Sequence, residues 1–416
     1  MLNNNNNNGT ATAPQFSIIL PSIATAGRIN SLKKSIQSVL QQTYDNFELI
    51  VSDNSIDGRV KHIIDQLKPN LKIRYIRPDQ ILNLPDHYEF ASSHAAGEWV
   101  LMLQDRLYML PNALKKIHDE IARFPNDIQA ICCPHGPAFD YRTGKLSVID
   151  YFSDNSELKK SRALVEAFAQ FTIKRELMPH VSNNFYHHNL AQEIRSRHGR
   201  LFTTAAISPD DSAGFLQLAY TDKILFIDRP IWIGHISNEG NSNGGYCTVN
   251  GMKSYLESIK IYDFFEKVPI PVDCVLNCTI YDLMTIKALA GHNLDTAELN
   301  INKYSIAIYK ELIIKESTGC RMDFATAYKK WRNFVKHLPD EQRVRILNGI
   351  KKKEYRQHPC LGMFRRFLAY SKALRFLRIL KSNFNRYYNT NNWSHLRYNN
   401  ILDAAKSIEH KIIIKS

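Results

Sequence analysis

Apolar residues in the first sixty positions follow two spacings, which predict a strand, a helix and a second strand. Residues 16–20 form an apolar run of strand length, and Pro21, which has no backbone N–H for a sheet ladder, is expected to end it. Residues 32–40 place apolar side chains at helical spacing. Residues 47–51 are again apolar and β-prone, and turn residues follow at 52–58. This order predicts a right-handed parallel crossover.

The two strand ends of this crossover are expected to meet at one ligand. Open α/β sheets bind ligands at the carboxyl ends of their strands. Pro21 and Ser22 stand at the end of the first predicted strand, and Asp53 stands at the end of the second. All three residues are therefore candidates for the same binding site.

These segments resemble the opening of family-2 inverting glycosyltransferases, which have the GT-A fold. The resemblance lies in ILPS at 19–22, SVLQQTY at 38–44 and FELIVSDNSID at 47–57, at matching spacing. Such a combination is far more specific than a lone glycine pattern. The resemblance implies a sugar-nucleotide donor.

The same resemblance assigns nucleotide-sugar binding to particular residues. In the family, the first strand end and the aspartate of the second strand contact the base and ribose, which implies that Asp53 contacts uracil or ribose. Pro21, Ser22 and Asp57 belong to the same expected site. The loop before Arg28 is a few residues longer than the family's turn, and Arg28 is assigned to the place of the family's arginine.

A second segment, AAGEWVLMLQDR at 95–106, resembles the strand that brings the family's acidic metal motif to the sugar diphosphate. Gly97 is expected to close a helix before this strand, as C-cap glycines do. The family's motif is usually Asp-x-Asp. Here Gln104 and Arg106 stand where the two aspartates are usual, and Asp105 lies between them.

Three interpretations of this triplet stay open. Asp105 would hold Mg²⁺ or Mn²⁺ together with phosphate oxygens and His235, because such cations prefer carboxylate oxygens. Alternatively, Arg106 would neutralise the diphosphate directly, since a guanidinium matches phosphate geometry. In the third interpretation the site has lost catalysis, and Asp105 and Arg106 are a solvated pair.

A third segment, SPDDSAG at 208–214, leads into a predicted helix and resembles a Ser/Thr-Pro-Asp segment of one glycosyltransferase subgroup. An inverting transfer needs one carboxylate to take the proton from the acceptor hydroxyl. Asp210 fits this role best, and Asp211 is the alternative. The structural interpretation is that Ser208 or Asp210 simply caps the helix.

A stretch rich in Gly, Ser and Asn follows at 233–245. Family members have a loop here that folds over the nucleotide, often with a histidine near the metal or the diphosphate, and His235 takes that place by resemblance. The composition would permit closure over a donor. The alternative is a linker that leaves the catalytic domain.

The chain is expected to have two domains. Strand signals become rare after residue 252, which predicts an α/β, GT-A-like domain with a mostly parallel central sheet over 15–245 and an α-helical C-terminal domain over 250–416. Residues 1–14, which include an asparagine run, are expected to be a disordered tail. Residues 141–200 are expected to be helical and polar. No apolar run approaches the roughly 20 residues that a bilayer-spanning helix needs.

Basic charge is concentrated near the C-terminus. The 416 residues have a formal net charge of +14, and residues 341–416 contain 17 Lys and Arg against 4 Asp and Glu. Within them, residues 361–380 combine an apolar stripe with basic side chains, as in helices that lie on anionic membranes. The alternative, given equal weight, is that this segment packs onto the helical domain with its basic side chains in solvent. The sequence contains no nucleic-acid module, and its seven scattered cysteines indicate reduced thiols in a cytosolic protein.

The sequence therefore predicts a hexosyltransferase-like glycosyltransferase that moves a sugar from a UDP-linked donor to a hydroxyl with inversion. A glycan or lipid-linked glycan acceptor in surface polysaccharide assembly is expected, with the protein in the cytoplasm, peripheral on the inner membrane face. The alternative is a non-catalytic sugar-nucleotide or glycan-binding subunit that docks a partner at the membrane.

Overall fold

The computed structural model describes residues 13–67, 70–124, 128–140, 144–147, 152–235, 251–317, 322–354 and 393–415. The expectations for the asparagine-rich residues 1–12, for the loop after His235 and for the basic segment 361–380 fall outside the described residues.

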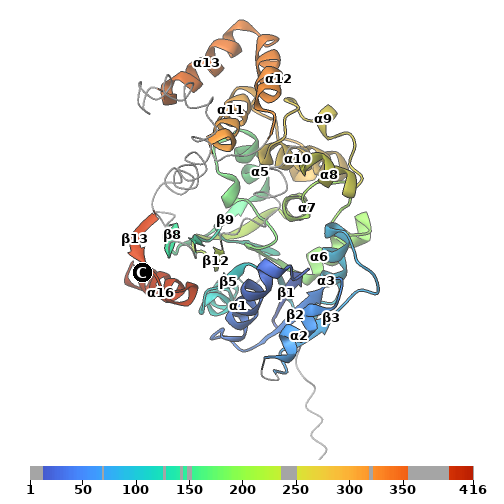
Figure 1. Cartoon of the computed structure of the whole chain (residues 1–416), viewed down its shortest axis with the longest axis vertical. Helices are drawn as coiled ribbons and strands as arrows, with labels where there is room; N and C mark the ends of the chain where they lie inside the picture. Colours follow the sequence, from blue (N-terminus) through green and yellow to red (C-terminus); the bar gives the residue numbers. More distant parts are fainter. Residues whose placement is uncertain are drawn as a thin grey trace, which may run out of the picture.

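The centre of the molecule is an eight-stranded sheet with the strand order β3-β2-β1-β4-β10-β6-β11-β9 (Figure 1). Its strands are β1 (Phe16–Ser22), β2 (Phe47–Asp53), β3 (Ile73–Ile76), β4 (Trp99–Met102), β6 (Ala130–Cys132), β9 (Ser156–Lys160), β10 (Asn184–His187) and β11 (Lys223–Ile227). In the described chain, four of its seven neighbouring pairs are parallel. The expected α/β class with a mostly parallel central sheet is confirmed.

The alternation of side chains along β1 gives the sheet two buried faces. Phe16, Ile18 and Leu20 enter one hydrophobic cluster, whereas Ile19 enters the other. The first cluster includes apolar residues of α1 (Ile29–Leu40), α2 (Arg59–Asp65) and α4 (Ala113–Arg123). The second includes those of α3 (Leu84–Ser93), α5 (Ser161–Ala169), α6 (His188–His198) and α7 (Pro209–Tyr220).

A smaller sheet has the strand order β13-β8-β7-β12-β5. Its strands are β5 (Leu107–Met109), β7 (Ala138–Asp140), β8 (Lys145–Ser147), β12 (Trp232–His235) and β13 (Trp393–Arg397). The following helix, α16 (Ile401–Lys415), also packs here: its Ile401, Ala404 and Ile408 join the cluster of α1 and α4. β13 and α16 thus return from the end of the chain to its first half (Figure 1).

The described residues between β12 and β13 are mostly helical. They are α8 (Gly251–Ser258), α9 (Phe264–Lys267), α10 (Val275–Ala290), α11 (Ile301–Ser317), α12 (Phe324–Lys336) and α13 (Asp340–Glu354). α10 packs beside α7, and α11 to α13 extend from it to one end of the molecule (Figure 1). Within the ranges given above, no helix has the length and hydrophobicity that a membrane crossing requires.

Pro21 was expected to end the first strand, but β1 continues through Pro21 to Ser22. Its ladder explains why proline is tolerated. The carbonyl of Ile19 accepts from the N–H of Leu103, the residue after β4, so Pro21, two residues on, faces the same side. β4 pairs with β1 only up to Met102, and no ladder partner there needs the missing N–H of Pro21.

Gly97 is not a helix cap, because α3 already ends at Ser93. The residue is instead constrained by β1. Its N–H donates to Ser17 Oγ at 2.8 Å, and a Cβ at this position would lie 2.5 Å from the Ser17 backbone nitrogen. The uniformly helical interpretation of 141–200 is also wrong, since this range contains β8, β9 and β10, strands too short for a clear periodicity.

Candidate active site

A cavity of about 700 Å³ opens where β1 and β4 end. Its walls come from the loop before α1, the turn after β4, the start of α7, the 3₁₀ turn at Arg175–Leu177, β12 and the helical region at α8 and α10. Segments from both halves of the described chain therefore enclose one space, as the crossover pattern requires at this sheet edge.

Asp105 lies in the turn after β4, and its side chain is only 3% exposed. Ser22 Oγ donates to its Oδ2 at 2.7 Å, and Arg28 Nη1 donates to its Oδ1 at 3.2 Å. Burial raises the pKa of Asp105, while the guanidinium of Arg28 acts in the opposite direction. Both carboxylate oxygens thus have protein donors.

Gln104 connects the triplet to the predicted base. The Nε and Nη2 atoms of Arg106 lie 3.3 and 3.2 Å from Gln104 Oε1, which accepts from both. The amide nitrogen of Gln104 in turn lies 3.4 Å from Asp210 Oδ2. The segments around residues 105 and 210 therefore meet in the same cavity.

Asp210 lies in the first turn of α7. Ser208 caps this helix by accepting from the Asp211 N–H at 3.3 Å, and Pro209 occupies the first turn, where proline costs no hydrogen bond. The side chain of Asp210 is 19% exposed and faces the cavity. Burial and the negative charge of Asp211 raise its pKa to about 6.

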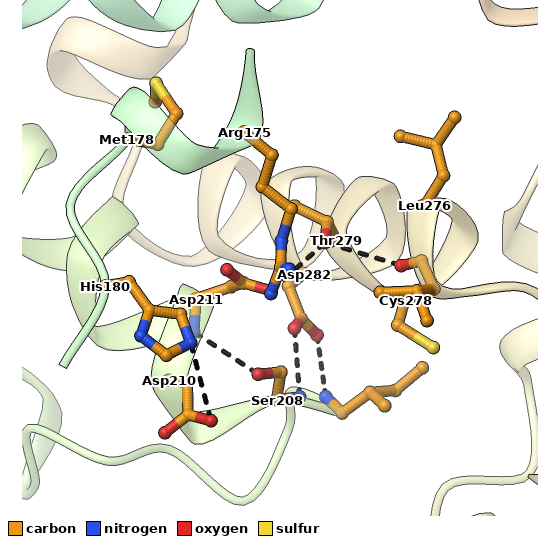
Figure 2. Close-up of polar contacts among 12 residues, drawn as sticks. Arg175, Met178, His180, Ser208, Asp210, Asp211, Leu276, Cys278, Thr279 and Asp282 are labelled. Carbon is orange, nitrogen blue, oxygen red and sulfur yellow. Dashed lines mark hydrogen bonds and ion pairs between the residues drawn. The ribbon is translucent and has the colours of Figure 1, made fainter. Parts of the chain in front are cut away.

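Asp211, the next residue, has hydrogen-bond partners different from those of Asp210 (Figure 2). Its Oδ2 accepts from Arg175 Nη2 at 2.7 Å and from Thr279 Oγ1 on α10 at 3.0 Å. Although burial acts to raise it, the pKa of Asp211 is lowered by the Arg175 guanidinium. Asp210, by contrast, points toward His180 in Figure 2. The two neighbouring carboxylates thus have different environments and different charge states near pH 6.

α10 also fixes the residues before α7. Asp282 is fully buried, and its two carboxylate oxygens accept from the backbone N–H groups of Ile207 at 2.6 Å and Ser208 at 2.9 Å (Figure 2). These groups would otherwise be unpaired at the helix start. The helical region therefore sets where α7 begins.

His180 and His135 were not predicted as site residues. His180 Nε2 lies 3.5 Å from Asp210 Oδ2, and its ring centroid is 5.1 Å from that of His135. Burial lowers the pKa of both histidines. Gly214 on α7 permits this packing, since a Cβ there would lie 2.1 Å from the Pro179 carbonyl oxygen.

Asp53 ends β2 as expected but does not line the cavity. Its side chain is fully buried: Oδ1 accepts from the Ser55 N–H at 2.8 Å, and Oδ2 accepts from the Tyr75 hydroxyl at 2.9 Å. The neighbouring Ser52 hydroxyl lies 2.9 Å from Nε2 of His87, which does line the cavity. Asp53 is therefore one layer behind the wall.

Asp57 lies outside the cavity, 53% exposed and paired with Arg59. The other predicted site residues come together. Those that line the cavity are Pro21, Ser22, Arg28, Gln104, Asp105, Arg106, Asp210, Asp211 and His235.

The described residues do not fit a Mg²⁺ or Mn²⁺ site. None of them forms a group of three or more His, Cys, Asp or Glu placed to hold a metal ion. Asp105, the carboxylate of the triplet, already accepts from Ser22 and from the cationic Arg28. One or two carboxylates together with substrate phosphates can hold such a cation, but here the guanidinium of Arg28 already pairs with the carboxylate and opposes a second cation on it.

Comparison with known proteins agrees with the resemblance to family-2 glycosyltransferases that the sequence motifs indicate. Residues 17–189 match the model of Glycosyl transferase family 2, a range that ends before α7. No curated protein sequence matches the chain.

Solved structures of S. aureus TarS are similar at a distance. The structure of TarS 1–349 in complex with UDP-GlcNAc has a TM-score of 0.45 and 12% identity, over 82% of this chain and 92% of that one. TarS 1–349 alone gives 0.43 and 13%, over 82% and 91%. A longer TarS structure gives 0.41 and 11%, over 81% of this chain but only 54% of that one. The present chain therefore spans about half the length of that TarS chain.

Proposed function

We propose that this chain, whose residues 17–189 match the model of Glycosyl transferase family 2, is a glycosyltransferase that moves a sugar from a UDP-linked donor to an acceptor hydroxyl with inversion. The observation that supports this best is the shared cavity. Asp105 and Arg106 reach it from the end of β4, Arg28 from the loop after β1, and Asp210 from α7. The cavity is within the size range of small-molecule sites, about 300–1,000 Å³.

Asp210 is the proposed general base. Its carboxylate takes the proton from the acceptor hydroxyl as that oxygen attacks the anomeric carbon on the face opposite the nucleotide. The bond from the anomeric carbon to the donor phosphate breaks, and its electron pair leaves with UDP. A base with a pKa of about 6 is ionised at neutral pH and remains basic enough to accept a proton.

Asp211 has a supporting role in this proposal. Its bonds to Arg175 and Thr279 fix the first turn of α7, while its negative charge raises the pKa of the adjacent base. Asp53 acts behind the cavity wall, where its bonds to Ser55 and Tyr75 shape the loop expected to hold the nucleoside. For the acceptor we propose a glycan or lipid-linked glycan.

The test is UDP release from a panel of UDP-sugars, with and without glycan acceptors. Asp210→Asn should lower kcat by about a hundredfold or more, the usual contribution of a general base, while UDP still binds. Asp119→Asn, an exposed aspartate on α4, is the matched control and should retain the rate. Persistent turnover in Asp210→Asn would contradict the proposed base. No turnover with any donor would favour the non-catalytic binding subunit.

A further inference from the structure

We propose that Arg28 and Arg106 take the place of a divalent cation in this site and bind the donor diphosphate without a metal ion. The proposal rests on the proposed function and specifies how the same cavity holds its donor.

Arg106 brings a positive charge to the cavity wall. It lies in the turn after β4, half-buried in the cavity wall, and its guanidinium contacts the neutral amide oxygen of Gln104. Among the described residues, no carboxylate lies within ion-pair distance of Arg106. A half-buried cation without a carboxylate partner, facing a cavity, indicates an anionic ligand.

Arg28 enters the same cavity from the other strand end. It is 19% exposed, and its ion pair with Asp105 at 3.2 Å positions the guanidinium. Arg28 is also the residue before α1, whose first turn contains no acidic residue and whose N-terminus has no side-chain cap. The positive end of this helix dipole therefore adds to the charge of Arg28.

The two arginines adjoin the same carboxylate, one in the structure and one in the sequence: Arg28 Nη1 pairs with Asp105 Oδ1 at 3.2 Å, and Arg106 is the residue that follows Asp105. Both arginines also line the cavity, beside the carboxylate of the triplet. A guanidinium presents a planar set of N–H donors that matches phosphate oxygens. Asp105 then holds Arg28 in place instead of serving as a metal ligand.

The experiment measures binding of UDP and UMP to the full chain by calorimetry, in EDTA and in MnCl₂. We expect UDP to bind in EDTA, with an affinity that Mn²⁺ changes by less than about threefold. Arg106→Gln should weaken UDP about tenfold to a hundredfold, as expected for a lost hydrogen bond to a charged group, and should weaken UMP much less. Arg106→Lys should recover part of the loss.

Arg59→Gln is the matched control, because this arginine is exposed and pairs with Asp57 outside the cavity. Asp105→Asn gives a second, independent readout. UDP binding in EDTA should persist in this variant, and Mn²⁺ should not strengthen it; if Asp105 were a metal ligand, Mn²⁺ would strengthen UDP binding in the wild type and not in this variant. Thermal unfolding of each variant shows whether it is folded.

Two results would overturn the inference while leaving the proposed function intact: UDP binding that requires Mn²⁺, or an undiminished preference for UDP over UMP in Arg106→Gln. Failure of every nucleoside diphosphate to bind, with and without Mn²⁺, would overturn both proposals.

Discussion

Replacing Asp282 tests whether the helical region determines the position of the proposed base. Asp282 on α10 is fully buried, and its carboxylate accepts from the backbone N–H groups of Ile207 and Ser208. Those residues lead directly into the first turn of α7, where Asp210 lies. Asp282→Ala would therefore leave two backbone donors buried at the start of this helix.

The expected magnitude follows from these two bonds. A buried donor left without its partner costs about 1–3 kcal/mol, so the free energy of unfolding should fall by roughly 2–6 kcal/mol. Relief of the repulsion between Asp282 and Asp211 offsets part of this cost. Asp282→Asn retains one acceptor oxygen and should lose about half as much. A displacement of Asp210 by about 1 Å would lower turnover by roughly a hundredfold.

Urea unfolding followed by intrinsic fluorescence measures the stability of the variants, and UDP release measures their turnover. The control is Asp340→Asn in α13, an 85% exposed aspartate whose replacement should change the stability by no more than about 0.5 kcal/mol. Equal unfolding midpoints for Asp282→Ala and the wild type would refute the reasoning. So would an unchanged turnover in a clearly destabilised but folded variant, because α10 would then not position the base.

Two further predictions concern pH and the membrane. A protonated Asp210 cannot accept a proton, so turnover should fall by about tenfold per pH unit below pH about 6. Asp211→Asn should move this limit to lower pH, because Arg175 then acts on Asp210 without an opposing negative charge. A limit that does not move in the pH–rate profile of this variant would contradict Asp210 as the base. Replacing basic residues in 361–380 by glutamine should weaken binding to phosphatidylserine vesicles by about 1 kcal/mol of binding free energy per charge removed, and should leave binding to neutral vesicles unchanged. Unchanged cosedimentation with phosphatidylserine vesicles would exclude this segment as the anchor. The residues to replace are Arg365, Arg366, Lys372 and Arg375.

Substitution is preferable to deletion in the membrane test, because removing everything after residue 360 would also remove β13 and α16. The ion pair between Arg229 and Glu409 shows the consequence. Arg229 is 7% exposed and Glu409 is 6% exposed, so truncation would remove one of the two carboxylates that pair with this arginine, leaving only Asp154 at 3.6 Å. A loss of vesicle binding after such a deletion could therefore reflect damage to the fold.

Residues at strand ends could be predicted from the sequence because their position follows from local pattern. Asp105 follows a run of buried apolar residues, and parallel strands bring their carboxyl ends to one edge. The family resemblance, which agrees with the match of residues 17–189 to the family model, added the residue types expected there. Asp210 was located in the same way, from a Ser-Pro-Asp helix start.

The partners of these residues could not be predicted. His180 and Arg175 lie in a segment without periodic signal, 30 and 35 positions before Asp210, and only tertiary packing brings them to α7. The burial of Asp53 was missed for a similar reason. Its motif located the strand end, but Tyr75 from the neighbouring strand and Ser55 from the turn take up its oxygens. Sequence position gives the edge of the sheet and not the direction of each side chain.

The return of β13 and α16 to the smaller sheet has a consequence for synthesis on the ribosome. Because chains emerge from the N-terminus, β8 must wait for more than two hundred residues of translation before its outer partner β13 is made. Until then, the apolar surface that Ile401, Ala404 and Ile408 later cover stays open to solvent or to chaperones. We therefore expect the nascent chain to be most prone to aggregation after its helices are complete and just before its last strand appears.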